Sequence, residues 1–224
     1  MNTYLKHIFP TPLYGGVNED TEIRTKICNL VYEWKENAFK EMNEISDSKS
    51  RLMSYHWDLQ SESNNGSDFD KHGITTFNSG NLALDPNWEF VCKFLLKMAY
   101  ELIGKECTYN IHLTSLWATL YPNSSYVPEH IHNNSLYSGV FYVKTSANCG
   151  DIVFKDPSYI AKTMAAIPMK SKTLSQFPTV DIVYTQEVSD GMMLLFPSWL
   201  PHSTQPNQSD EDRIILSFNL DFHE

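Results

Sequence analysis

The sequence predicts a mainly β fold, an antiparallel sandwich or barrel buttressed by N-terminal α-helices. Helical periodicity is confined to the first half of the 224 residues, and six β-rich runs follow from residue 111 onward without an intervening helix. A hydrophobic content of 42% is enough for one substantial core. We therefore expect one domain over residues 1–224, with 1–107 as helical and loop support and 108–224 as the β core.

Two stretches in the first half have the pattern of amphipathic helices. Between residues 18 and 45, apolar residues recur at intervals of three and four. They are Ile23, Ile27, Leu30, Val31, Trp34, Ala38 and Met42. A second helix should begin at Asp85, a capping residue, and Pro86, which suits the first helical position, and should end at Gly104. Each helix is apolar on one side only, so both are expected to cover a sheet.

The strands are expected in the second half of the chain. β-rich runs separated by turn residues lie at 111–121, 136–143, 151–154, 180–186, 192–196 and 213–222. In the last run, alternate residues from Ile214 to Phe222 are apolar, so one face of this strand should pack and the other should stay polar.

Two irregular segments complete the predicted fold. Residues 46–81 are rich in Ser, Asn, Asp and Gly, which indicates a long loop of the lid or binding type. Residues 155–178 lie between two strands and are expected to be an insertion over one end of the barrel. If the protein is an enzyme, these two segments would determine its substrate specificity.

Composition excludes some classes of partner. The net charge of -10, without any cluster of Lys and Arg, makes a nucleic acid duplex an unlikely partner. No segment approaches the ~20 apolar residues of a membrane span, and the N-terminus does not resemble a signal peptide, so we expect a cytoplasmic protein. The four cysteines are widely spaced and form no CxxC motif, which favours reduced thiols.

The motif PEHIHNN indicates a metal site. His130 and His132 are two residues apart just before a β-rich run, and in an extended chain their side chains project to the same side roughly 6.5–7 Å apart. His202 follows a late strand, which can lie beside an early one in a jelly roll. Three imidazoles would leave coordination positions open, as catalytic sites for iron, zinc, copper or nickel do. The remaining histidines are expected to be structural: His7, His56, His72, His112 and His223.

A cationic residue follows this third histidine. Arg213 lies at the start of the two-faced strand, and a buried guanidinium there would need an anion such as a carboxylate, which its fork can bind bidentately. Ser217 lies on the same face and could donate to that carboxylate. The alternative is a surface ion pair with one of the acids that precede Arg213, namely Asp210, Glu211 and Asp212.

Two segments, YPNSSYVPEHIHNNSLYSGVFYV and LLFPSWLPHSTQPNQSDEDRIILSFN, closely resemble the 2-oxoglutarate and Fe(II)-dependent oxygenases of bacteria and phages. FPTPLY near the N-terminus is a weaker match. The resemblance implies a double-stranded β-helix, a cupin-like jelly roll. It assigns His130 and His202 as iron ligands, and Arg213 with Ser217 as the residues that bind 2-oxoglutarate.

The chain departs from the family at the middle ligand. His132 stands where the wider superfamily usually has Asp or Glu, so the site would consist of three imidazoles. Glu129 or Asp151 could supply a carboxylate instead, although neither has the usual spacing. Tyr121 and Tyr142, in strands that flank the motif, are candidates for hydrogen bonds in the cofactor pocket, or else plain core residues.

Three functions follow as hypotheses. The first is an Fe(II)- and 2-oxoglutarate-dependent dioxygenase, a hydroxylase that acts on an unidentified substrate with dioxygen and has no catalytic residue beyond the metal ligands. The second is a cupin-like three-His iron dioxygenase, in which Arg213 holds the carboxylate of the substrate itself. The third is a noncatalytic jelly-roll binding module. The sequence leaves the substrate and the oligomeric state open.

Overall fold

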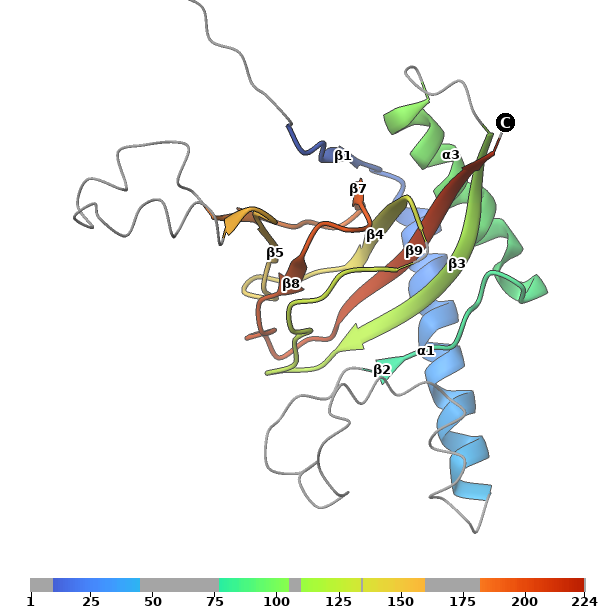
Figure 1. Ribbon diagram of the computed structural model, residues 1–224. Helices are drawn as coiled ribbons and strands as arrows, with labels where there is room; N and C mark the ends of the chain where they lie inside the picture. Colours follow the sequence, from blue (N-terminus) through green and yellow to red (C-terminus); the bar gives the residue numbers. More distant parts are fainter. Residues whose placement is uncertain (1–9, 45–76, 105–109, 134, 160–181, 224) are drawn as a thin grey trace, which may run out of the picture.

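The computed structural model describes residues 10–44, 77–104, 110–133, 135–159 and 182–223. These residues form three layers: a pair of helices, a large antiparallel sheet and a small antiparallel sheet (Figure 1). The mainly β class with flanking helices, predicted from the order of the periodic segments, is therefore confirmed.

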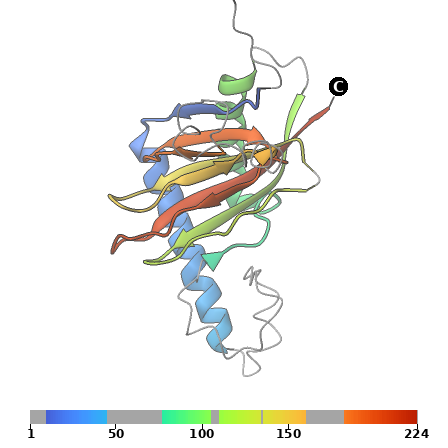
Figure 2. The ribbon, with the colours of Figure 1, turned by 60° about the vertical axis from the view of Figure 1, so that its left-hand side comes forward.

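The larger sheet has the strand order β1-β7-β4-β9-β3-β2, and its strands lie side by side in Figure 2. Its members are β1 (Tyr14–Val17), β7 (Met192–Pro197), β4 (Tyr137–Lys144), β9 (Arg213–His223), β3 (Asn110–Tyr121) and β2 (Phe77–Asn78). All neighbouring pairs are antiparallel. The smaller sheet has the order β6-β5-β8, formed by β6 (Val183–Gln186), β5 (Ile152–Lys155) and β8 (His202–Thr204).

Both predicted helices are present. Helix α1 (Thr21–Glu44) begins after Asp20, whose side chain accepts hydrogen bonds from two main-chain N–H groups of the first turn at 3.0 and 3.1 Å. Helix α3 (Glu89–Ile103) follows a short 3-10 turn, Pro86–Trp88, which is capped by the Asp85 side chain as the sequence indicates. The two helices lie on one face of the larger sheet (Figures 1 and 2).

The core has two parts because the larger sheet is covered on both faces. On the helix side, alternate β9 residues from Ile214 to Leu220 pack with the buried faces of α1 and α3. On the other side, a smaller apolar cluster fills the space between the two sheets and includes Tyr142, Phe154 and Phe196. The polar residues of β9 alternate with the helix-facing ones, so they face the space between the sheets. The prediction of a two-faced last strand is confirmed.

Three strands have no counterpart in the sequence prediction: β1, β2 and β8. All are short, and β1 contains two glycines, which lower β propensity. β1 and β2 form the two edges of the larger sheet although both precede residue 108. The N-terminal part therefore supplies strands as well as the helical support that we expected of it.

Some predictions fall on residues that the structure does not describe. They concern most of the loop at 46–81 and of the insertion at 155–178, and the histidines His7, His56 and His72. Neither described helix has the length and apolar content that crossing a bilayer would require.

Candidate metal centre

The structure brings the three histidines of the sequence prediction together. The backbones of His130 and His202 pair as a bridge, with reciprocal N–H···O hydrogen bonds of 2.9 and 3.0 Å, and their ring centroids are 4.3 Å apart. The His132 ring lies 5.2 Å from His130 and 5.1 Å from His202. One ligand atom from each residue lies within 4.8 Å of the other two, so the three imidazoles can converge on one ion.

His202 lies in a strand of its own. It follows β7, as the sequence predicts, and it is the first residue of β8 in the smaller sheet, opposite Phe154 of β5. A strand position holds the backbone more firmly than a turn would, since ladder hydrogen bonds fix it on the β5 side and the bridge to His130 fixes it on the other.

Each of the three rings is oriented by a hydrogen bond at Nδ1. The acceptor for His130 is the main-chain oxygen of Pro128, at 2.9 Å, and that for His202 is the main-chain oxygen of Leu200, also at 2.9 Å. The acceptor for His132 is a side-chain oxygen, described below, at 3.0 Å. Because an oxygen acceptor requires a proton on Nδ1, Nε2 keeps its lone pair when the ring is neutral. Nε2 is then the atom that can bind a metal.

Burial keeps two of these imidazoles neutral. It lowers the pKa of His202 to about 3 and that of His132 to about 4, and the nearby His130 contributes to both shifts. Metal binding requires neutral imidazole. His132 and His202 are already neutral at neutral pH, so neither has to lose a proton when a metal binds.

The metal-free protein should lose stability in acid because of these two histidines. The pKa of histidine in an unfolded chain is near 6.5, so below that pH the unfolded state binds protons that the folded state does not. We expect the free energy of unfolding to fall by about 2–3 kcal/mol between about pH 6.5 and about pH 5. Denaturant unfolding measures the fall, and His202→Gln should remove about half of it. An equal fall in the variant would contradict the buried, neutral state of His202.

Aromatic side chains enclose the cluster. Trp117 of β3 stacks on His132 with ring centroids 5.5 Å apart and an interplanar angle of 25°, and Phe196 of β7 packs edge-on against His202 at 4.7 Å. Trp199, three residues before His202 in the sequence, is 52% exposed. Trp117 and Phe196 therefore make the apolar wall, which lowers the local dielectric around the imidazoles.

No carboxylate belongs to the cluster among the described residues, which leaves a set of three imidazoles. Glu129 forms an ion pair with Lys155 at 3.0 Å, and the carboxylate of Asp151 accepts a hydrogen bond from the main-chain N–H of Val188 at 3.3 Å. The hypothesis that one of these two acids replaces His132 is therefore wrong.

Arg213 is buried between the two sheets. Its side chain is 1% exposed, and Nη1 donates to the main-chain oxygens of Cys149 and Gly150 at 2.7 and 2.8 Å. The guanidinium carbon lies 4.0 Å from the centre of the Tyr121 ring, a cation–π contact. The other side of the guanidinium is different, because Nε and Nη2 are buried and have no hydrogen-bond partner.

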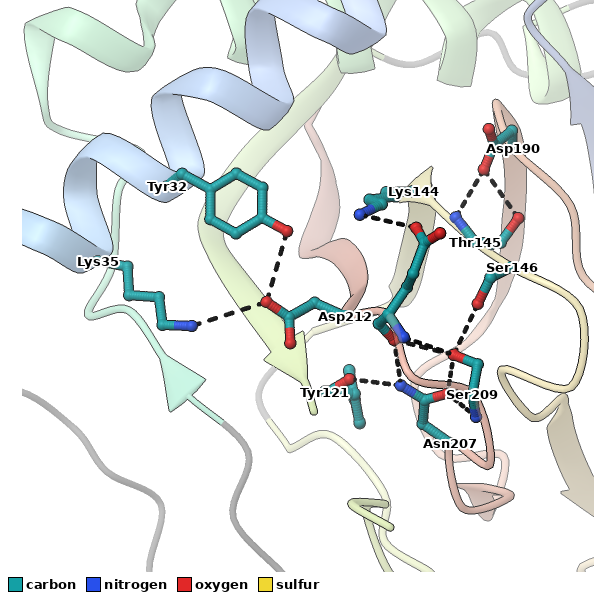
Figure 3. Close-up of polar contacts among 11 residues, drawn as sticks. Tyr32, Lys35, Tyr121, Lys144, Thr145, Ser146, Asp190, Asn207, Ser209 and Asp212 are labelled. Carbon is teal, nitrogen blue, oxygen red and sulfur yellow. Dashed lines mark hydrogen bonds and ion pairs between the residues drawn. The ribbon is translucent and has the colours of Figure 1, made fainter. Parts of the chain in front are cut away.

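The acidic residues before Arg213 do not neutralise it. Asp212 turns toward α1, where it accepts a hydrogen bond from Tyr32 at 3.4 Å and pairs with Lys35 at 3.7 Å (Figure 3). Glu211 pairs with Lys144 at 3.0 Å. No described carboxylate forms an ion pair with Arg213, so the surface pairing weighed above is wrong. A buried cation with two free N–H groups is suited to an incoming anion.

The other residues predicted for the cofactor pocket lie on the same side of the larger sheet. Tyr121 and Tyr142 are each 2% exposed, and burial raises the pKa of both phenols, so both stay protonated near neutral pH. Ser217 lies four residues after Arg213 on β9, opposite Val140 of β4. Roles for these side chains in binding a co-substrate remain predictions.

Sequence reasoning missed Asn219. Its Oδ1 is the acceptor for Nδ1–H of His132, and it also accepts from the Ser138 hydroxyl at 3.0 Å. The available signal was its place on the polar face of β9, six residues after Arg213. No local pattern in the sequence links Asn219 to a histidine 87 residues away.

Comparisons with known proteins agree with this geometry. Residues 115–219 match a family model described as "Putative 2OG-Fe(II) oxygenase", where 2OG is 2-oxoglutarate. That range contains the three histidines, Arg213 and Asn219. None of the curated proteins matches the sequence.

Solved structures resemble the fold at low sequence identity. AviO1 from Streptomyces viridochromogenes Tue57 is 14% identical, with a TM-score of 0.55 over 93% of this chain and 90% of that one. A prolyl-4-hydroxylase from Pseudomonas putida is 13% identical, with a TM-score of 0.50 over 93% and 92%. For a 2OG-Fe(II) oxygenase family oxidoreductase from Burkholderia pseudomallei, 11% identical with a TM-score of 0.40, the match covers 63% of this chain and 55% of that one.

The AviO1 and prolyl-4-hydroxylase structures support the double-stranded β-helix that the resemblance implied. The family model covers the strands and loops that carry the histidine cluster and the buried arginine. The resemblance to the 2OG-Fe(II) oxygenases that the sequence suggested is therefore confirmed by the family-model match over residues 115–219.

Proposed function

We propose that this protein is an Fe(II)- and 2-oxoglutarate-dependent dioxygenase, and specifically a hydroxylase. One observation carries the proposal: a cluster of three histidines and a buried arginine with two unpartnered N–H groups both contact the apolar cluster between the two sheets, through Phe196 and Tyr121. The cluster fits a metal, and the arginine fits the carboxylate of a co-substrate. The family match over residues 115–219 supports this assignment.

The donor set fits Fe(II). His130, His132 and His202 each use Nδ1 in a hydrogen bond to an oxygen, so Nε2 is the proposed ligand atom of each, and imidazole nitrogen is a suitable ligand for iron. Three protein ligands leave further positions for small molecules, which is typical of catalytic rather than structural sites.

The pocket around Arg213 fits 2-oxoglutarate. This molecule has a carboxylate at each end, and the far one would accept hydrogen bonds from Nε and Nη2 of Arg213, which are otherwise orphaned. Ser217 is the proposed second donor. Tyr121, whose ring lies against the guanidinium, holds Arg213 in place, and Tyr142 adds to the buried surroundings.

Bound iron and 2-oxoglutarate would supply oxidative chemistry with dioxygen that forms succinate and carbon dioxide and hydroxylates a C–H bond of the substrate. The chain itself orients the reacting groups. The Nδ1 hydrogen bonds keep the imidazole rings in one orientation, Arg213 sets the direction of the co-substrate, and Trp117 and Phe196 exclude water from the cluster.

A second function is favoured by a specific observation: no carboxylate of the described residues belongs to the cluster. In a three-His iron dioxygenase, the substrate binds the metal directly and Arg213 holds the carboxylate of that substrate. Oxygen consumption would then not depend on 2-oxoglutarate.

Product analysis separates the two functions. The protein is incubated with Fe(II), dioxygen and 2-oxoglutarate, with and without libraries of candidate substrates, and succinate is measured. The proposed function predicts succinate that depends on both iron and 2-oxoglutarate, with more of it when the substrate is present. Oxygen uptake by the iron-loaded protein without 2-oxoglutarate would favour the three-His dioxygenase, and no succinate under any condition would overturn the proposal.

A further inference from the structure

The three histidines differ in what fixes their rings. For His130 and His202, the acceptor of Nδ1–H is the main-chain carbonyl two residues earlier. Any residue type provides such a carbonyl, so these two hydrogen bonds do not depend on the identity of a side chain. For His132 the acceptor is a side chain, Oδ1 of Asn219 on β9, at 3.0 Å. The orientation of the middle histidine therefore depends on one replaceable group.

Asn219 is itself held by a buried polar network. The hydroxyl of Ser138 donates to Oδ1 of Asn219 at 3.0 Å and lies 2.8 Å from the hydroxyl of Ser198. Both serines are completely buried. The main-chain oxygen of Ser198 in turn accepts from the main-chain N–H of His132 at 2.9 Å. The network therefore holds His132 by two hydrogen bonds, one to its main-chain N–H and one to its ring.

The network has a chemical consequence for His132. A carbonyl oxygen can only accept, so Asn219 requires the proton of the neutral ring to be on Nδ1. The alternative tautomer would leave a buried Nδ1 lone pair facing the lone pairs of Oδ1, and it would carry its proton on Nε2, where a metal would have to bind. Trp117, stacked on the ring, restricts the tilt of the imidazole plane.

We propose that Asn219 is a positioning residue that holds His132 in the Nδ1–H tautomer and so makes Nε2 available to the metal. This inference rests on the proposed metal centre. It also gives the unusual middle ligand a physical explanation, since a histidine binds a metal well only when its other nitrogen has a suitable partner.

Two substitutions test separately whether Asn219 acts through its acceptor oxygen or through the volume of its side chain. Asn219→Asp keeps an oxygen at nearly the same place, and Asn219→Leu keeps a side chain of similar size without an acceptor. We expect Asn219→Leu to weaken binding of Co(II), used as an air-stable probe, by about 10- to 100-fold. We expect Asn219→Asp to stay within about threefold of the unchanged protein. Calorimetric titration measures both, and thermal unfolding verifies that each variant is folded.

The tautomer is read directly in the metal-free protein from long-range ¹H–¹⁵N correlations of the histidine rings. His132 should be in the Nδ1–H form in the unchanged protein and in Asn219→Asp, and should lose that form in Asn219→Leu. His130 and His202 should keep it in all three proteins, because their acceptors are main-chain carbonyls, and they serve as internal controls.

Co(II) binding and the His132 tautomer together show whether the proposed metal centre or the proposed role of Asn219 is wrong. If the unchanged protein bound no Co(II), the proposed metal centre would be wrong, and the tautomer measurement alone would decide the role of Asn219. If a folded Asn219→Leu protein kept the Nδ1–H form of His132, or bound Co(II) as tightly as the unchanged protein, the inference would be overturned.

Discussion

Replacement of His202 by alanine is expected to weaken Fe(II) binding by about 1,000-fold, because it removes one of three ligands whose joint binding energy is on the order of 10 kcal/mol. 2-Oxoglutarate turnover should be lost with the metal. Anaerobic dialysis against Fe(II), followed by metal analysis, measures the first effect, and succinate formation measures the second.

His112→Ala is the matched control for this variant. His112 is an exposed histidine on β3 and is not part of the cluster. Its replacement should leave iron content unchanged. Equal iron content in the His112 and His202 variants would show that the cluster is not the metal site.

Replacement of Arg213 by methionine should leave Fe(II) binding nearly unchanged and should weaken 2-oxoglutarate binding by about 30- to 1,000-fold. The estimate corresponds to the loss of about 2–4 kcal/mol from two buried, charge-assisted hydrogen bonds. Methionine fills a similar volume without donors. Titration of 2-oxoglutarate into the anaerobic Fe(II) protein measures the change.

The structural role of Arg213 needs its own control. The main-chain oxygens of Cys149 and Gly150 lose their donor in this variant, so a fall in thermal stability is expected. Arg213→Lys keeps a cation but not the planar fork, and it should recover only part of the 2-oxoglutarate affinity. Loss of iron from Arg213→Met to the same extent as from His202→Ala would indicate that Arg213 only supports the fold.

The sequence was sufficient for the fold class and for the elements with strong periodicity. α1, α3 and the runs that became β3, β4, β7 and β9 have apolar patterns that are set by burial on one or two faces. β1, β2 and β8 could not be read from the sequence. These segments are strands because they pair with strands that are distant in the sequence, and such pairing cannot be inferred from local residue patterns.

The candidate site was predictable to a similar degree. The two-residue spacing of His130 and His132 and the position of His202 after a strand were local signals, and the structure brings the three together. The partners of these residues were not local. The register between β4 and β9 places Ser138 opposite Asn219, and only that register brings the amide within reach of His132.

The charge environment of Arg213 also required the structure. Three acidic residues precede it in the chain, and a surface ion pair was a reasonable alternative on proximity alone. The loop before β9 instead directs Asp212 toward α1 (Figure 3). The Arg213 side chain is buried and donates to the main-chain oxygen of Cys149. Sequence distance says little about side-chain pairing at the start of a strand, because successive side chains point to opposite faces.

The central claim is that the histidine cluster and Arg213 bind one iron and one 2-oxoglutarate in a shared site. Its most direct test is anaerobic visible spectroscopy of the metal-free protein after addition of Fe(II) and then of 2-oxoglutarate. We expect the weak charge-transfer band of an iron-bound 2-oxo acid to appear only after the second addition, and at much higher 2-oxoglutarate concentration in Arg213→Met. Stoichiometric iron binding with no such band at saturating 2-oxoglutarate would contradict the claim.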